Sequence, residues 1–221
     1  MKTALLAFAA MAIVAAAEPA PRFARPASGP VDVAVVLTHG ANVMDFAGAW
    51  EVFQDTPFPG TEEPAFRLYT VSDSRAPLTL TGGLKVVPDY TFDYAPPPAV
   101  IVVGAQAGSP RMLQWLRQVN ASERTQVLMS VCTGAFKLAQ AGILDGKSAT
   151  THHDFFDEFS RRFPKVNLVR GERFVQSGPH LFTAGGLTSG VDLALHIVEL
   201  YFGAESARRT AAYMEYARRG N

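Results

Sequence analysis

Short, continuous apolar runs alternate along the chain with longer segments in which apolar residues recur at helical spacing. Four of the runs are rich in β-branched residues: 31–37 (VDVAVVL), 66–71 (FRLYTV), 99–103 (AVIVV) and 126–131 (QVLMSV). Continuous runs of this kind are typical of strands that are buried on both faces of a parallel sheet. The pattern therefore predicts four core strands.

Helical patterns follow or separate these runs. The spacing of the apolar residues predicts six helices and two further short strands. The helices are expected at 45–54, 111–119, 133–141, 154–163, 191–202 and 205–219, and the strands at 174–176 and 181–183. Residues 77–94 predict only irregular short strands. Buried strands alternating with helices indicate an α/β fold whose sheet is covered on both faces, and the absence of a second linker predicts one domain over 31–221.

The N-terminal segment follows a different pattern. Lys2 precedes TALLAFAAMAIVAAA, an apolar run that ends in an Ala-x-Ala site before Glu18. These features are typical of a cleaved signal peptide, and an uncleaved membrane anchor is the alternative. We therefore expect a signal peptide over 1–17, a flexible leader rich in Pro and Ala over 18–30, and a periplasmic or secreted protein. No later run is long enough to span a bilayer, so no membrane contact is expected after cleavage.

Charge and histidine spacing argue against two kinds of partner. The chain has 20 Lys and Arg residues and 20 Asp and Glu residues, whereas nucleic-acid binders usually carry a basic excess. His39, His180 and His196 lack ligand spacing with one another or with the single cysteine. We therefore expect no nucleic-acid partner and no metal.

The only cysteine, Cys132, lies where a predicted strand meets a predicted helix. SVCTG (130–134) has the small-x-nucleophile-x-Gly form of a turn that exposes a nucleophile at the carboxyl end of a strand. A helix beginning here would direct N–H groups and its positive dipole end at the sulfur, which predicts a lowered thiol pKa. The Thr133 amide would stabilise negative charge on a substrate. The pattern alone leaves open a nucleophile and a small buried hydrophobic residue.

The motifs around Cys132 resemble those of the ThiJ/PfpI superfamily. SVCTGAFKLAQAGILDGKSATTHHDF and TAGGLTSGVDLAL are most similar to isonitrile hydratases and to the sensor domains of related transcriptional regulators. The resemblance runs from about residue 31 to residue 202. It implies a flavodoxin-like three-layer α/β sandwich of the class I glutamine amidotransferase type, with a mostly parallel sheet and Cys132 on a nucleophile elbow. It also implies a homodimer that acts on a small molecule without a cofactor.

The resemblance also assigns an acidic partner to the cysteine. Asp45, in NVMDFAG, holds the position of a carboxyl group that hydrogen-bonds the thiolate and serves as acid or base. From the local pattern alone, Asp45 is a good helix N-cap, and the two roles can coexist. Glu51, six residues further on, is expected to be a helix-face residue.

Two positions depart from the patterns of the superfamily. The residue after Cys132 is Thr133, not the histidine of protease-like members, which argues against peptidase activity. The usual Pro-Gly-Gly after the third core strand is replaced by Gly104-Ala105-Gln106. We expect the amide of Gln106 or Ala105 to complete the oxyanion site with Thr133, in a pocket that the added side chains narrow or redirect.

Histidines and glycines near these motifs have structural alternatives. His152 matches a histidine that lies near the cysteine in many members, but His152 and His153 can also be polar residues that open a helix. The loop TAGGLTSGVD (183–192) lacks the Lys and the spacing of a P-loop. We expect it to pack closely under the elbow, with Thr188 or Ser189 capping the next helix.

The function expected from the resemblance is hydration of an isonitrile to an N-substituted formamide by the Cys132 thiolate, with Asp45 as acid and base. The alternatives are an exported, non-catalytic domain that senses a small molecule or the redox state, and a related glyoxalase or hydrolase.

Overall fold

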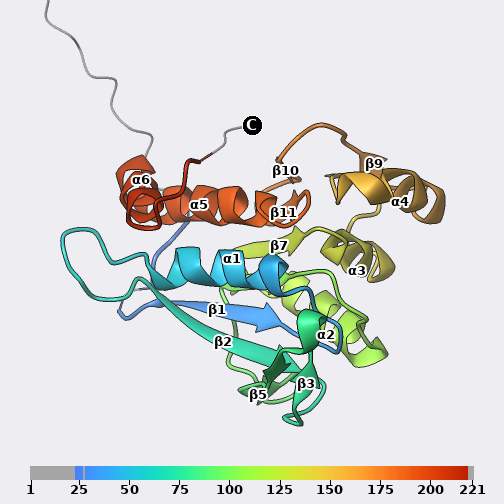
Figure 1. Ribbon diagram of the computed structural model, residues 1–221, viewed down its shortest axis with the longest axis horizontal. Helices are drawn as coiled ribbons and strands as arrows, with labels where there is room; N and C mark the ends of the chain where they lie inside the picture. The colour runs from blue at the N-terminus through green and yellow to red at the C-terminus, as the bar shows by residue number, and fades with distance from the viewer. Residues whose placement is uncertain (1–22, 27, 219–221) are drawn as a thin grey trace, which may run out of the picture.

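Helices cover both faces of a seven-stranded sheet in the computed structural model (Figure 1), which describes residues 23–26 and 28–218. The predicted signal peptide lies outside the described residues. The strand order is β10-β11-β7-β6-β1-β2-β5, and only β10 runs antiparallel to its neighbour. The strands of this sheet are β1 (Val31–Val36), β2 (Phe66–Ser72), β5 (Tyr90–Thr91), β6 (Val100–Val103), β7 (Val127–Val131), β10 (Phe174–Gln176) and β11 (Leu181–Ala184).

The remaining elements surround this sheet. The helices are α1 (Val43–Gln54), α2 (Pro110–Asn120), α3 (Gly134–Gln140), α4 (Phe156–Arg162), α5 (Ser189–Phe202) and α6 (Ala204–Tyr213), with 3-10 turns η1 (Thr81–Gly83) and η2 (His153–Phe155). Two small sheets pair β3 (Leu78–Thr79) with β4 (Lys85–Val86), and β8 (Ser148–Ala149) with β9 (Asn167–Leu168). The predicted flavodoxin-like α/β class and its mostly parallel sheet are confirmed.

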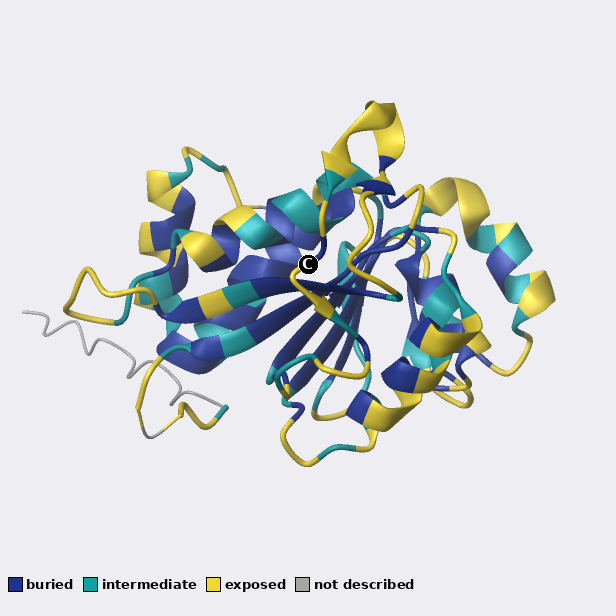
Figure 2. Ribbon diagram, turned by 90° about the horizontal axis from the view of Figure 1, so that it is seen from below, coloured by how far each residue is buried: buried dark blue, intermediate teal, exposed yellow. Residues whose placement is uncertain are grey.

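The two faces of the sheet support separate hydrophobic layers. Successive side chains of a strand point to opposite faces, so β1 sends Val33 and Val35 into the layer of α1, α5 and α6. Ala34 and Val36 enter the layer of α2, α3 and α4. Figure 2 shows the central strands as almost continuously buried. Burial on both faces explains why their sequences are apolar runs instead of alternating patterns.

The last helix is shorter than its sequence pattern predicts. We expected a helix over 205–219, but α6 ends at Tyr213. Glu215 adopts a left-handed φ of 51°, and the Tyr216 amide donates to the Ala211 carbonyl at 2.9 Å. This Schellman arrangement closes the helix. Packing of Tyr216 on the core therefore overrides the helical propensity of the residues that follow.

Part of the predicted leader packs against the domain. The Phe23 amide donates to the Leu200 carbonyl at 3.1 Å, and its ring lies 5.1 Å from that of Tyr201 in α5. Along the part of the chain that the structure describes, no helix is long and apolar enough to cross a membrane.

Candidate active site

A strained elbow presents Cys132 at the carboxyl edge of the sheet. The residue follows β7 directly and has a φ of 58°, a region that residues other than glycine seldom adopt. Its amide donates to the Gly185 carbonyl at 2.8 Å, and Thr151 Oγ1 donates to its carbonyl at 2.9 Å. A Cβ on Gly134 would lie 2.0 Å from the Val103 carbonyl oxygen. The predicted elbow is therefore confirmed, and its last glycine is required by close backbone contact.

Asp45 lies inside the first turn of α1 and is fully buried. The N-cap is Asn42, whose Oδ1 accepts from the Met44 amide at 3.0 Å, so the expectation that Asp45 caps the helix is wrong. Asp45 Oδ2 instead accepts from the Ala105 amide at 2.8 Å. A Cβ on Gly104 would lie 2.8 Å from the Asp45 Cβ. The glycine therefore lets the carboxyl group reach the loop after β6.

The carboxyl group of Asp45 and the thiol of Cys132 face each other. Burial raises the pKa of Asp45 to about 6, although interactions with the Ala105 amide, the Cys132 thiol and the Leu187 amide oppose the rise. Oδ1 has no hydrogen-bond partner among the described residues, so the contact with the thiol does not have the geometry of a regular hydrogen bond. Catalytic hydrogen bonds are often poorly aligned until substrate binds.

The thiol itself is protonated in this environment. Burial, followed by the negative charge of Asp45, raises the pKa of Cys132 to about 12, and the Thr133 and Leu187 amides only partly offset this rise. The predicted lowering of this pKa is wrong, because desolvation and a neighbouring carboxylate outweigh the amide dipoles. The resting pair is a thiol beside a carboxylate.

Leu187 contributes an amide that the sequence motifs did not indicate. It has a left-handed φ of 43°, and its N–H interacts with both the Cys132 sulfur and the Asp45 carboxylate. The preceding Gly185 and Gly186 were the available signal. A Cβ on Gly190 would meet the Val131 side chain at 2.8 Å, so the expected close packing under the elbow is present. Thr188 occupies the N-cap position of α5, as expected, but its side chain makes no capping hydrogen bond.

His152 packs against this glycine loop and does not bond to the thiol. A Cβ on Gly186 would lie 2.2 Å from His152 Cδ2. His152 Nδ1 accepts from the Asp154 amide at 3.2 Å, and its ring stacks on His153 with centroids 4.5 Å apart. No hydrogen bond joins His152 to Cys132 among the residues described. His152 thus opens η2, as the structural alternative predicted.

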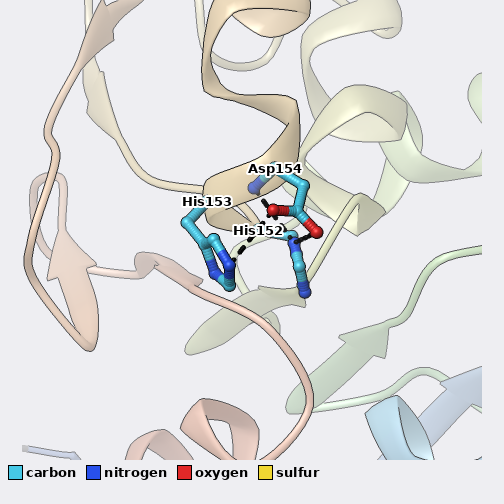
Figure 3. Close-up of side chains that lie close together, drawn as sticks. All are labelled: His152, His153 and Asp154. Carbon is cyan, nitrogen blue, oxygen red and sulfur yellow. Dashed lines mark hydrogen bonds and ion pairs between the residues drawn. The ribbon is translucent and has the colours of Figure 1, made fainter.

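The same turn holds a group of side chains with the spacing of metal ligands (Figure 3). The ligand atoms of His152, His153 and Asp154 lie within 4.8 Å of one another, and His153 Nε2 is 3.2 Å from Asp154 Oδ1. The histidine spacing along the sequence did not indicate this trio. His153 and Asp154 are exposed, and His152 Nδ1 already accepts a hydrogen bond. The arrangement therefore specifies no particular ion.

Of the two amides considered for the oxyanion site, only that of Gln106 is free. The Ala105 amide is taken by Asp45, whereas the Gln106 amide has no acceptor within the described part of the chain. The Gln106 side chain is held inward: Nε2 donates to the Val36 carbonyl and Oε1 accepts from Thr38 Oγ1, both at 3.0 Å. The structure thus places Gln106 and Thr133 on the wall of one cavity.

This cavity, which we name the α3–α4 cavity, has a volume of about 180 Å³. It begins at the residue that follows Cys132 and runs between α3 and the segment formed by η2 and α4. Its lining residues are Gln106, Thr133, Phe136, Lys137, Gln140, Phe155, Glu158 and Arg162. The cavity can therefore hold a small molecule against Thr133, the residue that follows Cys132.

The chain is similar in sequence to an enzyme and to a transcriptional regulator. The chain is 33% identical over 181 residues to an isonitrile hydratase of Pseudomonas putida, covering 79% of this chain and 73% of that protein. It is 29% identical over 177 residues to the HTH-type transcriptional regulator CdhR of Pseudomonas aeruginosa, covering 78% of this chain and 51% of the regulator, so it spans about half of that protein.

A solved structure and a family model extend this result. A ThiJ/PfpI family protein from Pseudomonas syringae superposes with a TM-score of 0.73 at 26% identity, covering 87% of this chain and 77% of that one. The model of the DJ-1/PfpI family matches residues 31–200, which include the elbow, Asp45 and the glycine loop. The chain therefore belongs to the DJ-1/PfpI family.

Proposed function

We propose that this protein is an exported, cysteine-dependent hydratase that converts an isonitrile to an N-substituted formamide without a cofactor. The observation that carries the proposal is the buried pair of Cys132 and Asp45, in which a protonated thiol faces a carboxyl group with a pKa of about 6. Such a carboxylate is ionised at neutral pH and suited to proton transfer. The 33% identity to an isonitrile hydratase supports the choice of substrate.

In the first step the thiol adds to the terminal carbon of R–N≡C. Asp45 takes the proton of the thiol while sulfur forms a bond to that carbon. One π pair of the carbon–nitrogen bond moves to nitrogen, and the lone pair of the carbon takes the proton from Asp45. The product is a thioformimidate, R–N=CH–S–Cys132, and Asp45 is ionised again. A carboxylate that removes the proton during attack makes a free thiolate unnecessary, which agrees with the raised pKa of Cys132.

In the second step water releases the product. Asp45 takes a proton from water while the water oxygen bonds to the thioformimidate carbon, and nitrogen receives the proton. The carbon–sulfur bond then breaks with its electron pair on sulfur. The hydroxyl proton passes through Asp45 to sulfur, which restores the thiol and leaves R–NH–CHO. The amides of Thr133 and Gln106 would orient the reacting groups during both additions.

The test measures formamide formation from cyclohexyl isocyanide by the purified protein. Cys132→Ala and Asp45→Ala are expected to abolish turnover, because each removes one partner of the pair. Glu51→Gln is the matched control, since Glu51 is an exposed acid on the same helix, and it is expected to keep wild-type turnover. Folded wild-type protein without turnover would contradict the proposal, as would activity retained in Cys132→Ala.

The second candidate is an exported domain that binds a small molecule without converting it. The raised pKa of Cys132 favours this alternative, because a thiol that stays protonated is a weak nucleophile unless a base assists it. The similarity to a transcriptional regulator also supports it. The same assay separates the two functions: the binding domain would hold cyclohexyl isocyanide equally well in wild type and Cys132→Ala, with no formamide produced by either.

A further inference from the structure

One face of α3 connects the reacting thiol to a cation. Phe136 and Lys137 lie three and four residues after Thr133, and Gln140 lies four and three residues after them, so the four residues share one side of the helix. The Thr133 amide interacts with the Cys132 sulfur. Lys137 stands one turn further on, about 6 Å along the helix axis. A small molecule in the α3–α4 cavity therefore contacts Thr133, the residue next to the thiol, at one end and Lys137 along its wall.

Lys137 has no acidic partner. Its Nζ donates to the Ala107 carbonyl at 2.8 Å, and no carboxylate forms an ion pair with it among the residues that the structure describes. An ammonium group has three donors, so two remain. The side chain is partly buried, and burial together with the positive charge of Arg162 lowers its pKa. A cation in such surroundings gains stability when an anion binds beside it.

The other charges of the cavity neutralise each other. Arg162 Nη1 donates to Glu158 Oε1 at 2.8 Å, and the guanidinium group lies over the Phe136 ring, 5.3 Å from its centroid. The remaining polar side chains of the wall are neutral. The positive charge of Lys137 is therefore left without a carboxylate partner, among the described residues, in a cavity whose wall also offers aromatic surface.

We propose that the α3–α4 cavity is a subsite for a carboxylate, and that Lys137 selects small electrophiles that carry one. The carboxylate would accept hydrogen bonds from Nζ of Lys137, while the opposite end of the molecule reaches Cys132. Lys137 is a specificity-determining residue and takes no part in the bond changes. The inference rests on the proposed function for the chemistry at the thiol, but the binding of the anion does not depend on turnover.

The test compares isocyanoacetate with its uncharged methyl ester, which has the same isocyanide group. Titration calorimetry on the Cys132→Ala variant measures both affinities without any reaction. We expect isocyanoacetate to bind about tenfold more tightly, the effect of one hydrogen bond to a charged group. Adding Lys137→Met should bring the two dissociation constants within about twofold, whereas Lys137→Arg, which keeps the charge, should retain a preference for the anion.

Lys165→Met, added to Cys132→Ala, is the matched control because Lys165 is an exposed lysine that pairs with Asp145. It is expected to leave the tenfold preference unchanged. Equal affinity for the acid and the ester would overturn the subsite. So would an equal loss of the preference for the anion in the Lys137→Met and Lys165→Met variants. A clear preference for the anion in a protein that turns over neither compound would support the subsite and refute the proposed hydration. Turnover of cyclohexyl isocyanide with no preference for the anion would support the proposed hydration and refute the subsite.

Discussion

Replacing Asp45 by Asn is expected to stabilise the protein at neutral pH while it removes activity. Asn has nearly the same shape, and its oxygen can still accept from the Ala105 amide as Asp45 Oδ2 does. The two side chains differ in the buried negative charge. This charge destabilises the native state, because burial raises the pKa of Asp45 from its ordinary value of 3.8 to about 6. At 1.36 kcal/mol per pKa unit, this rise corresponds to about 3 kcal/mol.

The sign of the pH dependence follows from the two states of the protein. The native state binds the Asp45 proton more tightly than the unfolded chain does, so native stability falls as the pH rises from about 4 to about 6 and is constant above that range. The ionised carboxylate of Asp45 destabilises the native state to its full extent at pH 7.5, and this destabilisation is mostly absent at pH 4. Asp45→Asn should therefore raise the free energy of unfolding by up to about 3 kcal/mol at pH 7.5, and by much less at pH 4.

Urea denaturation of wild type and Asp45→Asn at both pH values measures this difference. Glu51→Gln serves as the control for removing an acid from α1, and because Glu51 is exposed, its effect should stay within about 0.5 kcal/mol at both values. A variant that is less stable than wild type at pH 7.5 would refute the reasoning. The same would follow from a stabilisation of equal size at pH 4, since that gain could not come from the charge.

Three further outcomes are expected. Gly134→Ala should cost about 3 kcal/mol or more in urea denaturation, because its Cβ would lie 2.0 Å from the Val103 carbonyl oxygen. Gly142 also has a left-handed φ, but a Cβ there would meet no atom, so Gly142→Ala should lower the free energy of unfolding by only about 1 kcal/mol. An equal loss of stability in the two glycine variants would contradict the steric argument. The kcat/KM for cyclohexyl isocyanide should rise with pH through about 6 as Asp45 ionises, and a profile without that limb would exclude Asp45 as the base. N-terminal sequencing of protein recovered from outside the cytoplasm should begin at Glu18, and an intact N-terminus would refute signal cleavage.

The strands and the elbow could be predicted because their signals are local. A strand buried on both faces has to be apolar along its whole length, and the turn at Cys132 needs Gly134 within two residues. The fold class followed from these patterns and from the resemblance of their motifs.

The electrostatics of the site could not be predicted from local patterns. The pKa of Cys132 is set by burial and by Asp45, which comes from a different part of the chain. The amide of Leu187 reaches the thiol only because the loop after β11 adopts a left-handed turn. The start of α1 was also misjudged: Asn42 takes the capping role that Asp45 was expected to have. Contacts between distant parts of the chain decided the electrostatics of the thiol, whereas the cap is a local hydrogen bond from the Met44 amide to Asn42.

Gln106 divides the site into a fixed side and an adaptable side. Its side chain joins Val36, Thr38 and the loop after β6 through hydrogen bonds, and that loop in turn holds Asp45. Substitutions at Gln106 or in the loop after β6 would therefore disturb the position of Asp45 as well as the wall of the cavity. The wall formed by η2 and α4 bears none of the reacting groups, and its side chains Phe155, Glu158 and Arg162 can vary without moving the thiol. Directed evolution toward new substrates should therefore collect its successful substitutions on this wall and leave the Gln106 loop unaltered.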